Sequence, residues 1–407
     1  MLITSTHEPP GRGLLSTAEV ARRLGVKTQT VYAYVSRGLL RPDPASSHRN
    51  SLFASDEVER LATRARRPRR SGALEVVIET QLTALDPEGR LHYRGRDVIE
   101  LARFRSFEEV AGLLWDGEPP LPGALSPDDR DLIAALGAAL PPAARPVDRI
   151  PVAIAALAAT DAQRGDRRPE AVHRAAARML AGSLELITHG ASPDGGGMAE
   201  RLWFAVREDA GRPRPAQLQA LNAALVLLAD HELAASTLAA RVAASAWADP
   251  YRVVLAGLGP LGGSLHGAAS LAVEELLSEA GTPAGAYAAL ERRVVTGAVP
   301  GFGHRVYRGA DPRAQHLLER LRSISDDQQA LASVEAILDA AATLGLPPPN
   351  VDFALAALAR VMKLRAGSAS TIFTLARIAG LVAHGLEEYP HRLRFRPRAT
   401  YTGPAPR

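Results

Sequence analysis

The sequence predicts a mainly α-helical protein, in which a small helix-turn-helix unit precedes a larger helical body. Alanine and leucine are abundant and aromatic residues make up only 5% of the 407 residues, a composition that favours helix over strand. Apolar residues form 46% and charged residues 23% of the chain, as in globular and not disordered proteins. A chain of this length favours about two or three domains over one.

The first part of the chain, residues 1–63, has the pattern of a winged helix-turn-helix. Ser16 and Glu19 stand three residues apart, which is the spacing of a capping box at a helix start. Thr28 begins a second helix, and glycines end both helices. Ser55-Asp56-Glu57 opens a third helix, with acidic residues in its first turn. Two short helices joined through glycine are typical of this motif, and the arrangement resembles excisionase and MerR-type modules.

Positive charge is concentrated in this N-terminal part. Residues 1–72 hold 13 Lys and Arg against 6 Asp and Glu, so the rest of the chain holds 35 against 38. A basic head indicates a nucleic-acid partner for the head alone, and we expect residues 14–63 to contact DNA. A protein-interaction module and a vestigial module are equal alternatives. The residues expected to reach a groove, on the exposed side of the second helix, are Gln29, Thr30, Tyr32 and Arg37.

Residues 64–73 are predicted to be a basic linker. Five arginines and a proline lie between Arg64 and Arg70. The linker is either a solvated connector or a contact for phosphates, and the sequence favours neither.

Several classes of protein are excluded. The chain has no cysteine, which excludes disulfides and thiolate metal sites and makes a reducing cytoplasm the expected location. The first residues, MLITSTHEPPGRG, lack the apolar region of a signal peptide. No stretch of about 20 residues is free of charges and of Pro and Gly clusters, so we expect no membrane span.

A second domain is expected from residue 74 to residue 407. Val76–Thr80 has the composition of a short strand, and Asp86–Gly89 that of a turn. Ala- and Leu-rich helices then follow one another to about Glu388, separated by Pro- and Gly-rich breaks. The last segment, Leu393–Gly403, is basic and is expected to be extended.

The most informative segment of this domain is Gly301–Arg313. Glycines flank Phe302, where the backbone can approach a ligand closely, and one histidine and three arginines follow within ten residues. Arginine offers a planar fork that matches a carboxylate or phosphate, and Asp311 can hold one arginine in place. The segment suggests an anionic ligand, although alone it is better explained as a basic surface loop.

Three other segments change that balance. Asp230-His231 interrupts an otherwise apolar helix, and His266 stands between glycines at the mouth of a helix. Asp352 lies among apolar neighbours, where desolvation would raise its basicity. A lone histidine is more often structural, and a lone aspartate is more often a cap. Together, the three histidines His231, His266 and His304 and the one aspartate are harder to dismiss as structural residues, because each has a Gly- or Pro-marked or apolar setting.

In order and spacing these segments resemble the citrate synthase family, over about residues 74–403. The family's Gly-Phe-Gly-His…Asp-Pro-Arg pattern stands at residues 301–313, its Leu-His-Gly at 265–267 and its Asn-Val-Asp at 350–352. Tyr93–Asp97 also resembles an early family segment. The residues that match functional positions are His231, His266, His304, Arg313, Asp352, Arg377 and Arg396.

The resemblance implies a large and a small helical domain, the small one at about residues 268–363, and a homodimer. It implies condensation of acetyl-CoA with oxaloacetate and water to give citrate and CoA, with no cofactor and no metal. Asp352 would take a proton from the thioester methyl group. His266 would hydrogen-bond the thioester oxygen, and His304 would polarise the ketone of oxaloacetate.

The remaining matched residues would bind the substrates. His231 and the three arginines would hold the two carboxylates of oxaloacetate, with Arg396 supplied across the dimer. Arg308 would face the phosphates of CoA, unless it is only an exposed arginine.

The chain departs from the family pattern beside these positions. Ala234-Ala235 stand where asparagine is usual, Ser264 replaces a proline, and Ala268 and Ala354–Ala356 fall where polar groups are usual. These changes bear on which acyl-CoA is accepted and how fast it reacts. Because all seven matched residues are present, we favour an active enzyme. The alternatives are a 2-methylcitrate synthase that uses propionyl-CoA, and a DNA-binding regulator with a diverged synthase domain as ligand sensor.

Overall fold

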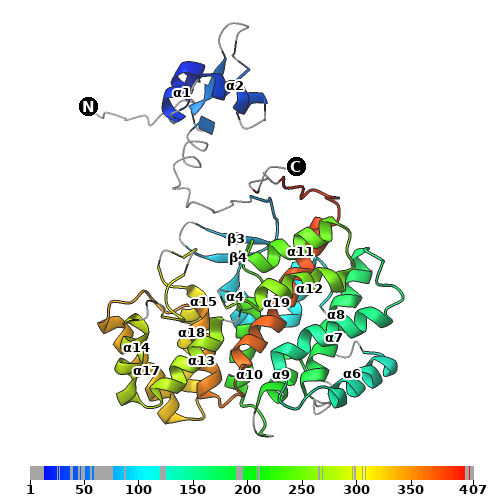
Figure 1. Cartoon of the computed structure of the whole chain (residues 1–407), viewed down its shortest axis with the longest axis vertical. Helices are drawn as coiled ribbons and strands as arrows, with labels where there is room; N and C mark the ends of the chain where they lie inside the picture. The colour runs from blue at the N-terminus through cyan, green and yellow to red at the C-terminus, as the bar shows by residue number, and fades with distance from the viewer. Residues whose placement is uncertain are drawn as a thin grey trace, which may run out of the picture. The chain divides into compact units, whose positions relative to one another are not determined.

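The computed structural model divides into two compact units, Met1–Val77 and Ile78–Arg407 (Figure 1). The residues that it describes are 13–24, 26, 28–36, 40–44, 46, 51–55, 57–58, 77–86, 89–119, 125–188, 196–207, 209, 211–264, 266–267, 269–295, 297, 299–304, 306–307, 309–398 and 403.

The first unit is a small helical body with a two-stranded antiparallel sheet. The predicted capping box is confirmed, because the Ser16 N–H donates to the Glu19 carboxylate (2.8 Å) and the Glu19 N–H donates to the Ser16 hydroxyl (3.4 Å). Its elements are β1 (Leu14–Ser16), α1 (Thr17–Leu24), α2 (Thr28–Ser36) and β2 (Leu52–Ala54), with β1 paired to β2. Its buried side chains are Val20, Ala21, Val31, Leu40, Phe53 and Val58.

The predicted DNA-contacting residues are described only in part. On α2, Tyr32 is 58% exposed and Thr30 is half-buried. The Gln29 side chain, Arg37 and the linker at 64–73 lie outside the described residues.

The second unit begins with a small sheet, placed differently from the prediction. The strand predicted for Val76–Thr80 is wrong: residues 77–80 have no regular structure, and the first strand forms after them. The turn that follows that strand explains its position, because the Gly89 N–H donates to the Asp86 carbonyl oxygen (3.0 Å) and closes the hairpin there. The strands, each antiparallel to the next, are β3 (Thr83–Leu85), β4 (Leu91–Tyr93) and β5 (Arg96–Asp97).

The rest of the second unit is helical, and the predicted succession of helices to about Glu388 is confirmed. The helices are α4 (Val98–Phe104), α5 (Phe107–Trp115), α6 (Pro127–Ala139), α7 (Pro146–Thr160), α8 (Pro169–Thr188), α9 (Met198–Val206), α10 (Pro215–Leu228), α11 (Ala235–Ser245), α12 (Pro250–Leu261), α13 (Ala269–Ala280), a 3₁₀ turn (Pro283–Gly285), α14 (Ala286–Val295), α15 (Pro312–Leu318), α16 (Leu321–Ile324), α17 (Gln328–Thr343), α18 (Val351–Val361) and α19 (Ser368–Glu388).

Helix α19 is the centre of this unit. It packs against α5, α7, α8, α10, α11, α12, α13 and α18, and Figure 1 shows α13, α14, α17 and α18 on one side of it and α6, α7 and α8 on the other. Among the described helices, α19 alone has the length and apolar composition to cross a membrane, but 94% of its apolar window is buried inside the protein. Its apolar residues therefore belong to the core, which also surrounds three ionisable residues of α19: Arg377, His384 and Glu388.

Candidate active site

The four polar segments lie at helix ends in the second unit. His231 is not inside a helix as predicted, because α10 ends at Leu228 and Glu232 adopts a left-handed φ of 56°. The Tyr93 hydroxyl accepts from the Asp230 N–H (3.0 Å) and donates to its carbonyl oxygen (2.8 Å). These bonds replace the bonds that would continue the helix, so a side chain from β4 ends α10 at this point.

The other three segments occupy the starts of helices. His266 lies in the turn before α13, and His304 lies in the loop before α15. Asp352 is in the first turn of α18, which the Asn350 side chain caps by accepting from the Asp352 N–H (3.0 Å).

Hydrogen bonds join the loop of His304 to the segment before α18. The Gly303 N–H donates to the Pro348 carbonyl (2.8 Å), and the Asn350 N–H donates to the Gly301 carbonyl (2.9 Å). Both glycines have left-handed backbone, with φ of 84° at Gly301 and 76° at Gly303, a conformation that glycine adopts without strain. They therefore allow the two segments to pair, which places His304 beside the start of the helix that carries Asp352.

Asp311 holds Arg313, as the sequence predicts. Its carboxylate accepts from Arg313 Nε (3.0 Å) and Nη2 (2.9 Å), and also from the Val351 N–H (3.1 Å). Burial opposes ionisation of Asp311, but the Arg313 charge and hydrogen bonds lower its pKa. Arg313 Nη2 lies 3.4 Å from His304 Nε2. The buried ion pair of Asp311 and Arg313 thus lies between His304 on one side and the Val351 N–H at the start of α18 on the other.

His231, His304 and Tyr307 form a compact aromatic group. His231 Nε2 lies 2.9 Å from the Tyr307 hydroxyl, and the ring centroids of the two histidines are 5.3 Å apart. Burial, reinforced by the nearby arginines, lowers the pKa of His304 to about 4 and that of His231 well below its usual value. Both imidazoles are therefore neutral at pH 7.

His266 is positioned by Ser236, near the start of α11. The Ser236 Oγ lies 2.8 Å from His266 Nε2. This hydrogen bond orients the ring and leaves Nδ1 available for a second partner. Burial, followed by the charge of Arg377, lowers the pKa of His266 to about 4. Ser236 and Tyr307 are not among the residues predicted from the sequence. Tyr307 stands within the informative segment, whereas nothing local distinguishes Ser236 from a residue of a helix start.

Arg377 is a buried charged group and Asp352 is half-buried, and each has a buried atom with unused hydrogen-bonding capacity. Arg377 Nε donates to the Leu228 carbonyl (2.9 Å), but Arg377 Nη1 and Asp352 Oδ1 have no hydrogen-bond partner among the described residues. Burial raises the pKa of Asp352 to about 7, against the opposing effect of the arginines. Buried polar atoms without partners are rare in folded proteins, so these two atoms indicate a place for a ligand.

Shared electrostatic neighbours bring the predicted residues together. Arg377 acts on both Asp352 and His266, and Arg313 acts on both Asp352 and His304. The base candidate and the two imidazoles therefore lie within electrostatic reach of one buried pair of arginines.

Two predicted residues do not join this group. Arg396 is exposed in the segment after α19, and Arg308 lies outside the described residues. In the part of the chain that the structure describes, no group of three or more His, Asp or Glu side chains is arranged to hold a metal ion.

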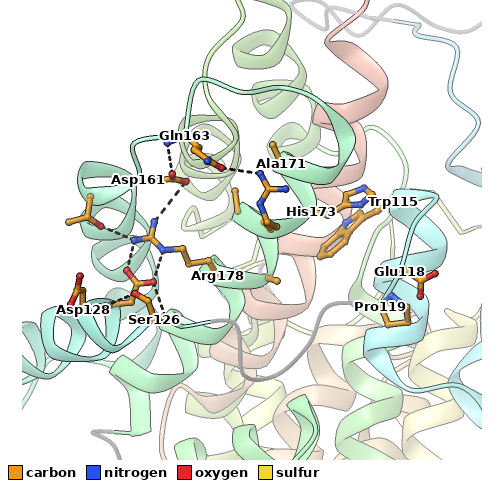
Figure 2. A pocket seen from close by; sticks show the side chains of 15 residues that line it. Trp115, Glu118, Pro119, Ser126, Asp128, Asp161, Gln163, Ala171, His173 and Arg178 are labelled. Atoms are coloured by element: carbon orange, nitrogen blue, oxygen red, sulfur yellow. Dashed lines mark hydrogen bonds and ion pairs between the residues drawn. The ribbon is translucent and has the colours of Figure 1, made fainter.

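A large cavity among the described residues lies elsewhere. It has a volume of about 850 Å³ and is lined by the ends of α5 and α7, the start of α6 and the first half of α8 (Figure 2). There Arg178 pairs with Asp129 and donates to the Thr160 hydroxyl (2.8 Å), while Trp115 stacks on His173. The charge on Arg178 is thus already neutralised, and the buried atom without a partner in this lining is the Nε2 of a histidine, His173. The cluster instead holds an unpaired guanidinium nitrogen of Arg377 and an unpaired carboxylate oxygen of Asp352. We therefore place the site at the cluster of histidines and arginines.

Comparison with known proteins identifies the family of the second unit. Residues 73–398 match the model of the citrate synthase C-terminal domain. The chain belongs to the citrate synthase family. Citrate synthase 2 of Bacillus subtilis is 33% identical to it over 358 residues, covering 81% of this chain and 94% of that protein. The 2-methylcitrate synthase of Mycobacterium tuberculosis is 32% identical over 361 residues, covering 82% and 90%.

Solved citrate synthases share the fold. The enzyme of Pyrobaculum aerophilum gives a TM-score of 0.69 at 30% identity, covering 81% of this chain and 91% of that one. The Thermoplasma acidophilum enzyme, a ternary complex with carboxymethyl coenzyme A and oxaloacetate, gives 0.69 at 28% identity, covering 82% and 95%. Residues 15–65 match the model of MerR HTH family regulatory proteins. The predicted fold and both predicted resemblances are confirmed: this is a mainly helical enzyme of the citrate/2-methylcitrate synthase family, behind an N-terminal helix-turn-helix.

The raised pKa of Asp352 predicts a pH-dependent cost to stability. The folded protein holds this proton up to a pKa of about 7, against the ordinary value of 3.8. Between these values the folded state binds more protons than the unfolded state, so this group lowers stability as pH rises. We expect Asp352→Asn to stabilise the protein more at pH 8 than at pH 5, by on the order of 2–3 kcal/mol, measured by denaturation at both pH values. Asp339→Asn, on the exposed side of α17, controls for the substitution itself, and an equal gain at both pH values would contradict the burial of a charged Asp352.

Proposed function

We propose that the chain condenses acetyl-CoA with oxaloacetate and water to give citrate and CoA. The observation that carries the proposal is a desolvated carboxylate, Asp352, and two neutral imidazoles, His266 and His304, around two buried arginines. These are the groups that the reaction needs, because a weak carbon acid must lose a proton while two oxygens gain negative charge.

Asp352 is the base that removes a proton from the thioester methyl group. Its pKa of about 7 makes it a stronger base than an ordinary carboxylate, while a large part of it remains ionised near neutral pH. His266 donates a hydrogen bond to the thioester oxygen as that oxygen becomes an enolate. The Ser236 hydroxyl supports this role if it donates to Nε2, because the proton of the neutral ring is then on Nδ1.

His304 acts on the other reactant. The N–H groups of Val306 (3.0 Å) and Tyr307 (3.3 Å) donate to His304 Nδ1. We therefore place the proton of its neutral ring on Nε2, because the 3.4 Å separation from Arg313 Nη2 is too long for a strong hydrogen bond to that nitrogen. That N–H donates to the ketone oxygen of oxaloacetate and stabilises the alkoxide when the carbon–carbon bond forms. Water then hydrolyses the thioester of the condensed product and releases CoA.

The arginines orient the dianion. Arg313 and Arg377, with His231, hold the two carboxylates of oxaloacetate, and a carboxylate oxygen bonded to Arg377 Nη1 would satisfy its unused donor. Arg308 faces the phosphates of CoA. Arg396 completes the clamp from the second copy of a homodimer, which accounts for its position outside the cluster of its own chain.

Turnover should depend on Asp352 much more than oxaloacetate binding does. We expect thiol release from acetyl-CoA with oxaloacetate, at a higher kcat/KM than with propionyl-CoA.

We expect Asp352→Asn to lower kcat by about a hundredfold or more, because it removes the base. The dissociation constant for oxaloacetate should change less than about threefold.

Each outcome of this experiment has a distinct reading. No turnover with any short acyl-CoA overturns the proposed function, and a higher kcat/KM with propionyl-CoA turns it into a 2-methylcitrate synthase. Equal loss of turnover and of oxaloacetate binding in Asp352→Asn contradicts the role of Asp352 as the base.

Arg396→Ala should weaken oxaloacetate binding while its control does not. Loss of one arginine–carboxylate contact is expected to raise the KM for oxaloacetate about tenfold. Arg398→Ala removes the same charge two residues away and should leave this KM unchanged. An unchanged KM in Arg396→Ala, or a monomeric protein in solution, contradicts the clamp across a dimer.

The first unit favours a second function, which is DNA binding regulated by the synthase domain. The match to MerR regulators, the basic N-terminal part and the exposed Tyr32 on α2 support it. We expect the full chain to bind a DNA fragment from its own gene region, with an affinity that falls steeply as salt increases. We expect Tyr32→Ala to weaken that binding at every salt concentration. Fluorescence anisotropy with a scrambled fragment as control tests this, and equal affinity for both fragments would mean that the unit reads no sequence.

A further inference from the structure

A second row of buried polar groups begins at Arg377 of the substrate cluster and continues away from it along α19. On α19, Arg377, His384 and Glu388 recur at intervals of seven and four residues, so they lie along one face of the helix. His384 and Glu388 are fully buried, as are Asp230 beside α10 and Arg241 on α11. Buried charges of this kind are costly unless each has a defined partner.

The partners form a continuous chain of hydrogen bonds. Arg241 donates through Nη1 to Glu388 (2.7 Å) and through Nε to His384 Nδ1 (2.9 Å), and its Nη2 pairs with Glu387. His384 Nε2 lies 3.2 Å from Asp230 Oδ2. Because the guanidinium is always a donor, Nδ1 of His384 must be the acceptor, and the proton of its ring is on Nε2. The His384 N–H therefore donates to Asp230.

The Asp230 carboxylate is held from two sides. The Thr83 hydroxyl on β3 donates to the same oxygen, Oδ2, at 2.5 Å. On the α19 side, the Gly380 N–H donates to the Ala229 carbonyl (3.0 Å), and a Cβ on Gly380 would lie only 2.5 Å from Asp230 Oδ1. The turn that carries Asp230 is thus fastened to α19, and the next residue in that turn is His231.

This geometry fixes His231 relative to Arg377. Both substrate-binding candidates depend on the same contact: Arg377 lies on α19, and His231 lies in the turn that His384 fastens to α19. Asp230 also stabilises the charge of Arg377. Small displacements of binding groups weaken recognition of a rigid, doubly charged ligand.

We propose that His384 and Asp230 are positioning residues for the oxaloacetate clamp. His384, oriented by Arg241, holds Asp230 so that His231 and Arg377 keep the separation that the two carboxylates require. This inference rests on the proposed function, because it takes the ligand to be oxaloacetate.

A pair of substitutions at one position separates positioning from simple packing. His384→Gln can place an amide N–H where Nε2 stood and keeps the bond to Asp230, whereas His384→Asn can place an acceptor where Nδ1 stood and keeps only the bond from Arg241. We expect His384→Asn to raise the dissociation constant and the KM for oxaloacetate about tenfold, with a smaller change in kcat. For His384→Gln, the dissociation constant for oxaloacetate should stay within about threefold of that of the native protein. This should hold even where its melting temperature falls as much as that of His384→Asn.

A second matched pair covers the outcome in which neither variant folds. Thr83→Val removes the hydroxyl that donates to Asp230, and Thr371→Val removes a buried hydroxyl of α19 that donates only to the Gly367 carbonyl (2.9 Å). Calorimetry should show weaker oxaloacetate binding in Thr83→Val and native binding in Thr371→Val.

The outcomes separate this inference from the function on which it rests. Equal oxaloacetate affinity in both variants of a pair overturns the positioning role. A native protein that does not bind oxaloacetate at all overturns the proposed function instead.

Discussion

The site depends on keeping the charged guanidinium of Arg377 inside the protein core. Burial alone disfavours this charge and lowers the pKa of Arg377, and isolated buried charges cost several kcal/mol or more. The structure offsets this cost in part, with the Leu228 carbonyl at the end of α10 and the negative charge of Asp230. Nη1 remains without a partner among the described residues, so the folded chain retains a buried donor that an anion can satisfy.

The same competition between burial and charge sets the state of the other groups. Around Asp352, burial outweighs the two arginines and raises the pKa, whereas around Asp311 the direct ion pair with Arg313 outweighs burial and lowers it. The contacts of these two neighbouring carboxylates therefore shift their pKa values in opposite directions. The difference assigns Asp311 to structure and leaves Asp352 available for proton transfer.

Much of this arrangement is visible in the sequence, because short patterns fix local structure. The capping box at Ser16 and Glu19, the glycines beside Phe302 and the Asn cap before Asp352 each act within a few residues. The two wrong predictions have different causes. The helix around His231 ends because the Tyr93 hydroxyl, 137 residues away in sequence, replaces its backbone bonds. The first strand lies after residue 80 because the hairpin turn sets its position.

Three departures from the family pattern, Ala234, Ala354 and Ala356, lie in the helices that surround the cluster. Ala234 stands at the N-cap of α11, where it makes no side-chain cap bond, so the missing asparagine would have served a helix end. That helix carries Ser236, which orients His266. Ala354 and Ala356 are fully buried within α18, where small apolar side chains fit the packing against α13, α15 and α19. The described ionisable groups around Arg377 and Arg313 are all present, so these three changes leave the charges of the cluster intact and alter only its surroundings.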